Sequence, residues 1–243
     1  MDGTGDLFFT QAPHLKPYFD LRALAIPRTD LSSWPDLAKQ VVQLIHHLAG
    51  YRPIYLCGES FGACLALQAL SLAPDLADYV ILINGASSLH RFPWEHWLTQ
   101  LNPAALGAIV KSFSLGYWPL LADPSRIRPD HYQRLLGAIQ SVPPLTMAWR
   151  LALLAQFRLE ATLLHRLKAP TLLIASLADQ LLPSLAEAQY LATHLPNARL
   201  YPLPHSGHAS LLERQVNLGQ ILAETHFLPA PGRVPEPPQA VPL

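Results

Sequence analysis

A serine between two glycines is the feature of this chain whose residue types and spacing could do chemistry. The segment Cys57–Gly62 reads C-G-E-S-F-G, which matches the pattern Gly-x-Ser-x-Gly with Ser60 at its centre. A short apolar run, Pro53–Leu56, precedes the pattern, and a helix-compatible run, Ala63–Leu72, follows it. Strand, tight turn and helix is the context that presents a serine hydroxyl as a nucleophile. A plain Gly/Ser turn between a strand and a helix is the alternative interpretation.

The predicted nucleophile turn comprises Gly58, Glu59, Ser60 and Gly62. A turn this tight predicts a strained backbone at Ser60 and an exposed hydroxyl. We expect Gly58 and Gly62 to be required, because side chains there would collide with the neighbouring strand and helix. Glu59 occupies the variable position before the serine.

A serine hydroxyl needs a general base at neutral pH, and the base needs an acid that orients it. In a strand–turn–helix context the expected chain order is serine, acid, histidine, each after a strand. Asp179 follows the apolar run 171–175 and is the predicted acid, with a helix cap as its alternative role. His208 follows the run 199–203 and is the predicted base.

His205 is the competitor of His208 for the role of base. It lies nearer the end of the predicted strand, but no glycine precedes it, whereas Gly207 precedes His208 and gives the backbone room to turn. We therefore predict that Ser60, Asp179 and His208 act together.

Two backbone N–H groups should stabilise the negative oxygen that forms when the serine attacks a carbonyl. One is the amide of Phe61, the residue after the nucleophile. The other should come from the loop at residues 1–6, which makes the amide of Met1 or Asp2 the second predicted donor. At the start of the sequence, we expect these residues to be poorly fixed.

The composition bounds the class of protein. The chain has 243 residues, 50% of them hydrophobic and 14% charged, with a formal net charge of zero. These values favour one α/β domain with a large core and give no indication of a nucleic-acid partner. We find no metal-ligand spacing and no phosphate-binding glycine loop, so we predict no metal and no cofactor.

The two cysteines, Cys57 and Cys64, flank the serine turn. We interpret both as reduced packing residues, which favours a reducing compartment. The sequence has no apolar stretch of about 18 residues and no basic, apolar leader, so neither a transmembrane helix nor a signal peptide is predicted. We expect a cytoplasmic protein that could touch membranes peripherally.

Apolar periodicity predicts strands that alternate with helices. A helix should begin at the cap Ser33 and end at Gly50. The other predicted strands lie at 18–26, 79–83, 171–175 and 199–203, and the other helices at 184–194 and 209–225. This alternation predicts an α/β fold with a mostly parallel sheet and helices on both faces.

The pattern changes between the two middle strands. We predict that residues 1–85 and 168–228 form the core, that 86–167 form an inserted helical cap, and that the proline-rich segment 229–243 is a disordered tail. Extra core helices are the alternative to a cap. Four of the five tryptophans fall in the insertion: Trp94, Trp97, Trp118 and Trp149.

Up to about residue 228, the sequence resembles the α/β-hydrolase superfamily. Asp2–Gly5, the serine turn and Asp179–Ser184 with Glu187 and Ala188 resemble a plastid and cyanobacterial esterase/lipase/thioesterase-type group that includes the phytyl ester synthases. Plant members of that group carry a second, acyltransferase-like region. We see no His-x4-Asp motif here, so any acyl transfer would use Ser60.

Related proteins have an apolar strand before the Asp-Gly-Thr-Gly loop, and no such strand precedes Asp2 here. Losing a strand beside the one that leads to Ser60 would expose backbone hydrogen-bonding groups. Either the sequence starts too late, or the molecule lacks a central strand. We expect the natural protein to have roughly 15 to 60 more N-terminal residues, enough for one to three strands.

The leading functional hypothesis is a serine hydrolase or acyltransferase that forms an acyl-enzyme with a lipid-like ester or thioester. The tryptophan-rich and leucine-rich insertion favours a small apolar acyl substrate. We infer no obligate protein partner. The alternatives are a lyase or cofactor-free haloperoxidase on the same fold, and a non-catalytic or truncated protein.

Overall fold

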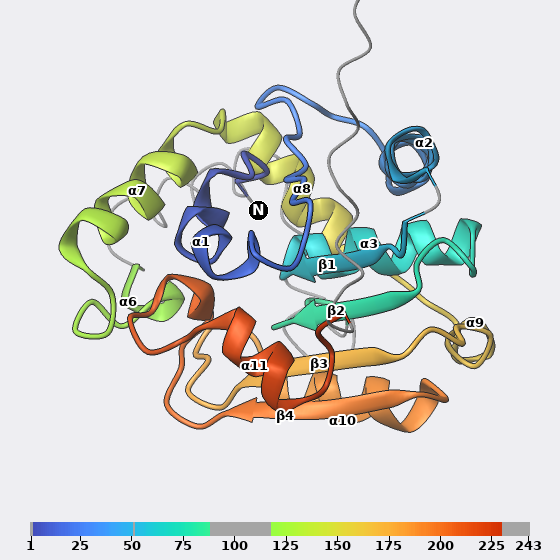
Figure 1. Ribbon diagram of the computed structural model, residues 1–243. Coiled ribbons are helices and arrows are strands. Elements are labelled where there is room, and N and C mark those ends of the chain that lie inside the picture. Colours follow the sequence, from blue (N-terminus) through green and yellow to red (C-terminus); the bar gives the residue numbers. More distant parts are fainter. Residues whose placement is uncertain (1, 51, 88–117, 230–243) are drawn as a thin grey trace, which may run out of the picture.

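The computed structural model describes residues 2–50, 52–87 and 118–229 (Figure 1). Met1, positions 88–117 of the predicted cap, and the predicted tail beyond residue 229 lie outside these ranges. Trp94 and Trp97 are therefore not described.

The described strands form one parallel sheet. Their order is β1 (Tyr55–Glu59), β2 (Tyr79–Ile83), β3 (Thr171–Ser176) and β4 (Ala198–Leu203), and every neighbouring pair runs parallel. Parallel neighbours need crossover connections, and the helices supply them. The predicted parallel α/β sheet is confirmed. The bounds of β2, β3 and β4 lie within one residue of the predicted positions, whereas β1 begins two residues and ends three residues later than the predicted run 53–56.

Helices cover both faces of the sheet because the strand side chains alternate in direction. On one face, Leu82 and Leu173 pack in the main core with α2 (Trp34–Ala49), α3 (Phe61–Leu72) and α10 (Ser184–His194). On the other, Ile83 and Ile174 pack with α1 (Ala12–Leu15) and α11 (Leu218–Glu224) (Figure 1). The sheet is a rigid platform for the loops that follow its strands.

The residues that flank α2 explain where the helix begins and ends. Ser33 accepts a hydrogen bond at its Oγ from the Asp36 N–H at 3.4 Å, and Pro35 occupies the first turn. Gly50 ends the helix at a φ of 57°, which a residue without a Cβ adopts freely. The predicted cap-to-glycine helix is confirmed.

Helices also fill the described part of the segment between β2 and β3. They are α6 (Trp118–Leu121), α7 (Pro129–Gln140), α8 (Pro144–Gln156) and α9 (Ala161–Leu164), which we call the inserted helices. Helix α8 packs against the main core through Leu153 and Leu154, and the Leu153 carbonyl accepts a 2.7 Å hydrogen bond from Trp34 Nε1. The division of the chain into core and cap stays a prediction.

Two predicted elements are wrong. Residues 19–26 form no strand, because no neighbouring strand among the described residues pairs with them; the Ile26 N–H donates instead to the Gly3 carbonyl. The predicted last helix begins later than expected. A short 3-10 helix, η3 (Ser210–Leu212), ends where Glu213 forms an antiparallel bridge with Ile127, and α11 starts at Leu218.

The two cysteines differ in environment. Both are free; Cys64 is buried in α3, as predicted, but Cys57 is exposed. The exposure of Cys57 contradicts its interpretation as a packing residue.

Candidate active site

The carboxyl ends of the four parallel strands lie at one edge of the sheet, and a polar residue follows each of them. Ser60 comes after β1, Asn84 after β2, Asp179 after β3 and His208 after β4. Loops at this edge are where open α/β sheets bind their ligands. The topology alone therefore gathers side chains that lie 24 to 148 positions apart in sequence.

Ser60 has the strained backbone that the turn predicts. Its φ is 55° and its ψ is −115°, and its N–H donates to the Ile83 carbonyl at 2.9 Å. A Cβ at Gly58 would lie 2.7 Å from the Ala63 nitrogen and would overlap the Gly62 carbonyl. The requirement for glycine at position 58 is therefore confirmed.

The expectation for Gly62 is wrong. A Cβ at this position would meet no atom within 4 Å, and Gly62 does not have a positive φ. The crowded atoms are those of the Gly62 backbone, which approaches Gly58 closely. The turn requires that the backbone of residue 62 pass close to Gly58. It does not require that residue 62 lack a side chain.

Alanine substitutions should separate the two glycines. We expect Gly58→Ala to lower the free energy of unfolding by about 3 kcal/mol, because the added methyl overlaps backbone atoms that cannot rotate away. Gly62→Ala should change it by less than about 1 kcal/mol, since alanine favours a helix more than glycine does. Urea unfolding of both variants measures the difference, and equal losses would contradict this account of the turn.

The structure brings Ser60, His208 and Asp179 into one hydrogen-bonded series. Ser60 Oγ lies 2.9 Å from His208 Nε2, and His208 Nδ1 lies 2.8 Å from Asp179 Oδ2. The serine donates to Nε2 and Nδ1–H donates to the carboxylate when the neutral imidazole carries its proton on Nδ1. The geometry is that of a nucleophile, a base and an orienting acid.

Asp179 is held by four donors. Oδ1 accepts from the Leu181 and Leu182 N–H groups at 2.9 and 3.0 Å, and Oδ2 accepts from Ser184 Oγ and His208. Burial raises the pKa of Asp179, but the hydrogen bond and charge of His208, with the bonds from Ser184 and Leu182, outweigh it and lower the pKa below its ordinary value. The side chain is a fixed carboxylate.

His208, and not His205, faces the serine. His208 is 5% exposed, whereas His205 is exposed and makes no hydrogen bond among the described residues. Gly207 does not have the positive φ that only glycine tolerates well. Its contribution is its N–H, which donates to Glu213 Oε1 at 2.8 Å.

Sequence reasoning missed Asn84, which joins the ends of β2 and β3 to the loop that carries His208. Its Nδ2 donates to the His208 carbonyl at 2.8 Å and to Ser176 Oγ at 2.9 Å, and its Oδ1 accepts from the Ser176 N–H. Asn84 is 1% exposed and has a φ of 46°, a conformation that asparagine tolerates better than most residues. A polar residue directly after a buried strand was the only signal.

Glu59 places a second carboxyl group beside the series. Its Oε1 is buried and has no hydrogen-bond partner among the described residues. Burial raises the pKa of Glu59 to about 7, while the charge of His208 acts in the opposite direction. The folded protein therefore holds a proton on Glu59 at a pH where the unfolded chain has released it.

This proton predicts a pH dependence of stability. Because the pKa in the folded state is the higher one, the contribution of Glu59 to stability should be complete below about pH 4.5 and should be lost as the pH rises through about 7. Glu59→Gln should remove this fall, so that wild type loses about 3 kcal/mol relative to the variant between pH 4.5 and 8. Urea unfolding at both pH values measures this change in the free energy of unfolding, with the exposed Glu160→Gln as control. An equal change in wild type and Glu59→Gln would show that Glu59 is not the group responsible.

The two predicted oxyanion donors differ in what the structure says of them. Phe61 begins α3, is 3% exposed and stacks on Trp34 with ring centroids 4.7 Å apart, so packing fixes its backbone. Met1 is outside the described residues. Asp2 is better fixed than expected: its carbonyl accepts from Arg150 Nη1 at 2.8 Å, and its carboxylate accepts from the Thr4 N–H. The donor role of Met1, Asp2 and Phe61 stays a prediction.

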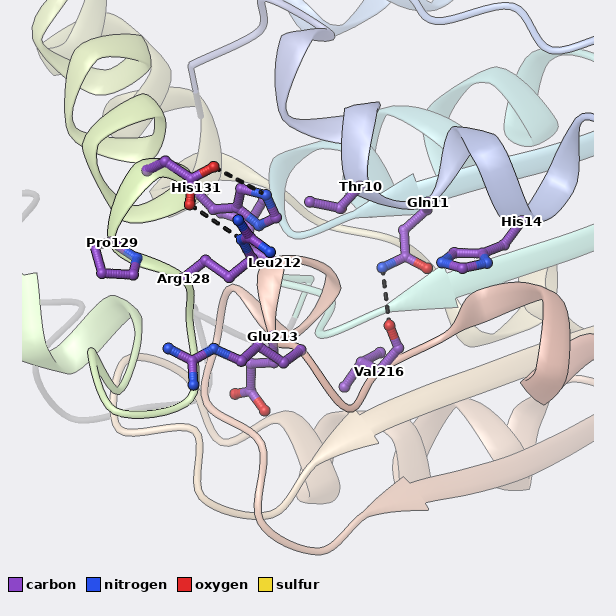
Figure 2. Close-up of a pocket in the computed structure, with 11 residues that line it drawn as sticks. Thr10, Gln11, His14, Arg128, Pro129, His131, Leu212, Glu213 and Val216 are labelled. Atoms are coloured by element: carbon purple, nitrogen blue, oxygen red, sulfur yellow. Dashed lines mark hydrogen bonds and ion pairs between the residues drawn. The ribbon is translucent and has the colours of Figure 1, made fainter.

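A cavity of about 590 Å³ lies between the start of α7 and the segment that contains Gln11 and His14 (Figure 2). It is lined by residues of η1 (Asp6–Thr10), α1, the start of α7 and the segment after η3. Ser60, Asp179 and His208 do not line it.

Within the described ranges, no group of three or more His, Cys, Asp or Glu residues could hold a metal ion. The helices described are all too short or too polar to cross a membrane.

Comparison with known proteins agrees with this geometry. A family profile described as alpha/beta hydrolase fold matches residues 11–215. Phytyl ester synthase 1 of Arabidopsis thaliana is 32% identical over 93% of this chain, which spans only 36% of that protein's length. The RutD protein of Stutzerimonas stutzeri, named for carbamate hydrolysis, is 31% identical over 77% of this chain and 71% of its own.

Solved structures share the architecture. An esterase from Exiguobacterium antarcticum superposes with a TM-score of 0.73 at 18% identity, covering 92% of this chain and 87% of its own. The profile covers most of the sequence, and the sheet order, the strained serine turn and the three side chains occur in the same chain. The chain therefore belongs to the alpha/beta hydrolase fold family.

Proposed function

We propose that this protein is a serine hydrolase of the esterase, lipase or thioesterase type that acts through an acyl-enzyme on a lipid-like acyl ester. One observation carries the proposal: Ser60 Oγ, with its positive φ, lies 2.9 Å from His208 Nε2, whose Nδ1 contacts Asp179. A hydroxyl placed against an oriented imidazole is an activated nucleophile.

Each of the three side chains has a role in the proposed reaction. Ser60 Oγ attacks the acyl carbonyl and His208 Nε2 takes its proton, while Asp179 stabilises the imidazolium. The carbonyl oxygen becomes an oxyanion facing the Phe61 N–H and the amide of Met1 or Asp2. When the bond to the leaving alcohol or thiol breaks, His208 returns the proton to it. Water then attacks the acyl-serine while His208 takes its proton. The bond between the acyl carbon and Ser60 Oγ breaks, His208 returns the proton to Oγ, and the acid is released.

Acyl transfer would use the same intermediate with a different acceptor. If an alcohol such as phytol attacks the acyl-serine in place of water, the product is a new ester. The similarity to a protein named phytyl ester synthase supports this possibility, and the partial coverage of that protein leaves it a proposal. The apolar acyl substrate, the cytoplasmic location and the absence of an obligate protein or nucleic-acid partner also stay predictions.

Labelling with a fluorophosphonate probe tests the proposal directly. We expect covalent labelling that peptide mass spectrometry assigns to Ser60, together with hydrolysis of p-nitrophenyl acyl esters. A series of acyl lengths, with and without phytol, distinguishes hydrolysis from transfer, and a carbamate ester tests the chemistry for which RutD is named. A folded protein that neither labels nor turns over any of these substrates would overturn the proposal.

A further inference from the structure

The backbone on the amino-terminal side of His208 is tied to the inserted helices. The Gly207 N–H donates to Glu213 Oε1 at 2.8 Å, and Glu213 Oε2 accepts from Arg126 Nε at 2.7 Å. Arg126 lies in the connection between α6 and α7. One carboxylate therefore bridges the residue before His208 to an arginine of the inserted segment.

The backbone on the other side of His208 is tied to the same segment. The Ala209 N–H donates to the Leu121 carbonyl, the last residue of α6, at 2.8 Å. The Arg214 N–H donates to the Arg126 carbonyl at 3.0 Å. Both neighbours of His208 thus take their position from residues 121–126, while Asn84 holds the His208 carbonyl from the sheet side.

Burial makes the contact between Glu213 and Arg126 consequential. The Glu213 side chain is 1% exposed and that of Arg126 is 22% exposed. A buried carboxylate that loses its cation is strongly destabilised and must find other donors or move. Moving it would leave the buried N–H of Gly207 without an acceptor, which is also unfavourable.

Glu213 is committed to this contact and is not free to bind a ligand in the neighbouring cavity. It lines the cavity of about 590 Å³, but Figure 2 shows its carboxyl group pointing away from Gln11 and His14 on the opposite wall. Both carboxyl oxygens are already occupied by Gly207 and Arg126.

We propose that Arg126 and Glu213 are positioning residues for His208, which make the placement of its imidazole against Ser60 depend on the inserted helices. The inference rests on the proposed function for its kinetic consequence, although the placement itself can be observed without turnover. A misplacement of about 1 Å at a catalytic group can cost on the order of 100-fold in rate. A shift of this size away from Ser60 would break the 2.9 Å hydrogen bond between His208 Nε2 and Ser60 Oγ.

Kinetics of Arg126→Gln, Glu213→Gln and the double variant test the proposal. We expect kcat for a short p-nitrophenyl ester, per titrated active site, to fall by roughly 10- to 100-fold with KM within about twofold. The double variant should be no slower than the slower single variant, because both changes remove one interaction. Arg128→Gln is the matched control: its ion pair with Asp130 has both side chains more than 60% exposed, so kcat should not change.

Proton NMR supplies a readout that does not depend on activity. The Nδ1 proton of His208, hydrogen-bonded to Asp179, should give a low-field signal that broadens or shifts in Arg126→Gln and Glu213→Gln but not in Arg128→Gln. An unchanged signal and an unchanged kcat, with only a lower melting temperature, would overturn the positioning role. An altered signal in a protein that hydrolyses nothing would support the positioning role and contradict the proposed function instead.

Discussion

Replacing Ser60 by Ala should lower kcat/KM for a short acyl ester by about 10⁴-fold or more and should abolish fluorophosphonate labelling. The change removes the only atom that can form the acyl-enzyme and leaves the imidazole of His208 without the donor that lies 2.9 Å away. Folding should be little affected, because alanine and serine meet nearly the same strain at a φ of 55°. Steady-state kinetics together with thermal unfolding measure both effects.

Ser71→Ala is the matched control for this substitution. Ser71 lies on α3, the helix that Ser60 precedes, and its Oγ donates to the Gln68 carbonyl at 2.7 Å. We expect this variant to keep the activity and labelling of wild type. Retained turnover in Ser60→Ala, with the control also active, would show that another residue is the nucleophile and would remove the basis of the proposed function.

The features that could be predicted from the sequence are those that short segments encode. The cap at Ser33 and the glycine at position 50 bound α2, and continuous apolar runs locate the buried strands β2 and β3. The meeting of Ser60 with His208 was also predictable, because parallel strands place all of their carboxyl ends at one edge of the sheet. The chain order of Ser60, Asp179 and His208 and the topology of the strands were thus enough to predict most of the candidate site.

The features that could not be predicted depend on partners far away in the chain. Asn84 reads in the sequence as a loop residue, and its bond to His208 spans 124 positions. Glu213 lies in a stretch whose apolar spacing predicts a helix, but a contact with Arg126, 87 positions earlier, decides its role. Residues 19–26 have the composition of a strand, yet a strand exists only where a neighbour pairs with it.

Asp179→Asn should lower kcat for the same ester by about 10³- to 10⁴-fold while leaving the fold intact. The backbone N–H groups of Leu181 and Leu182 both point at one oxygen of the side chain, so the amide oxygen of asparagine must occupy that position. The amide NH₂ then faces His208 Nδ1, which must accept a hydrogen bond rather than donate one. The imidazole proton moves to Nε2, and the nitrogen that faces Ser60 can no longer take its proton.

Asp75→Asn is the matched control, because Asp75 is exposed and lies in the turn between α3 and β2, at the opposite end of the sheet from Ser60; activity should stay at the wild-type level.

The size of the loss at position 179 decides between the two roles that the sequence allows for this aspartate. A carboxylate that only organises the loop before α10 could be replaced by asparagine, since the amide oxygen still serves Leu181 and Leu182, and kcat would fall less than about tenfold. That result would make Asp179 a cap and would require another acid to orient His208. A loss of three orders of magnitude with unchanged unfolding requires the negative charge itself, at the one oxygen that His208 Nδ1 contacts.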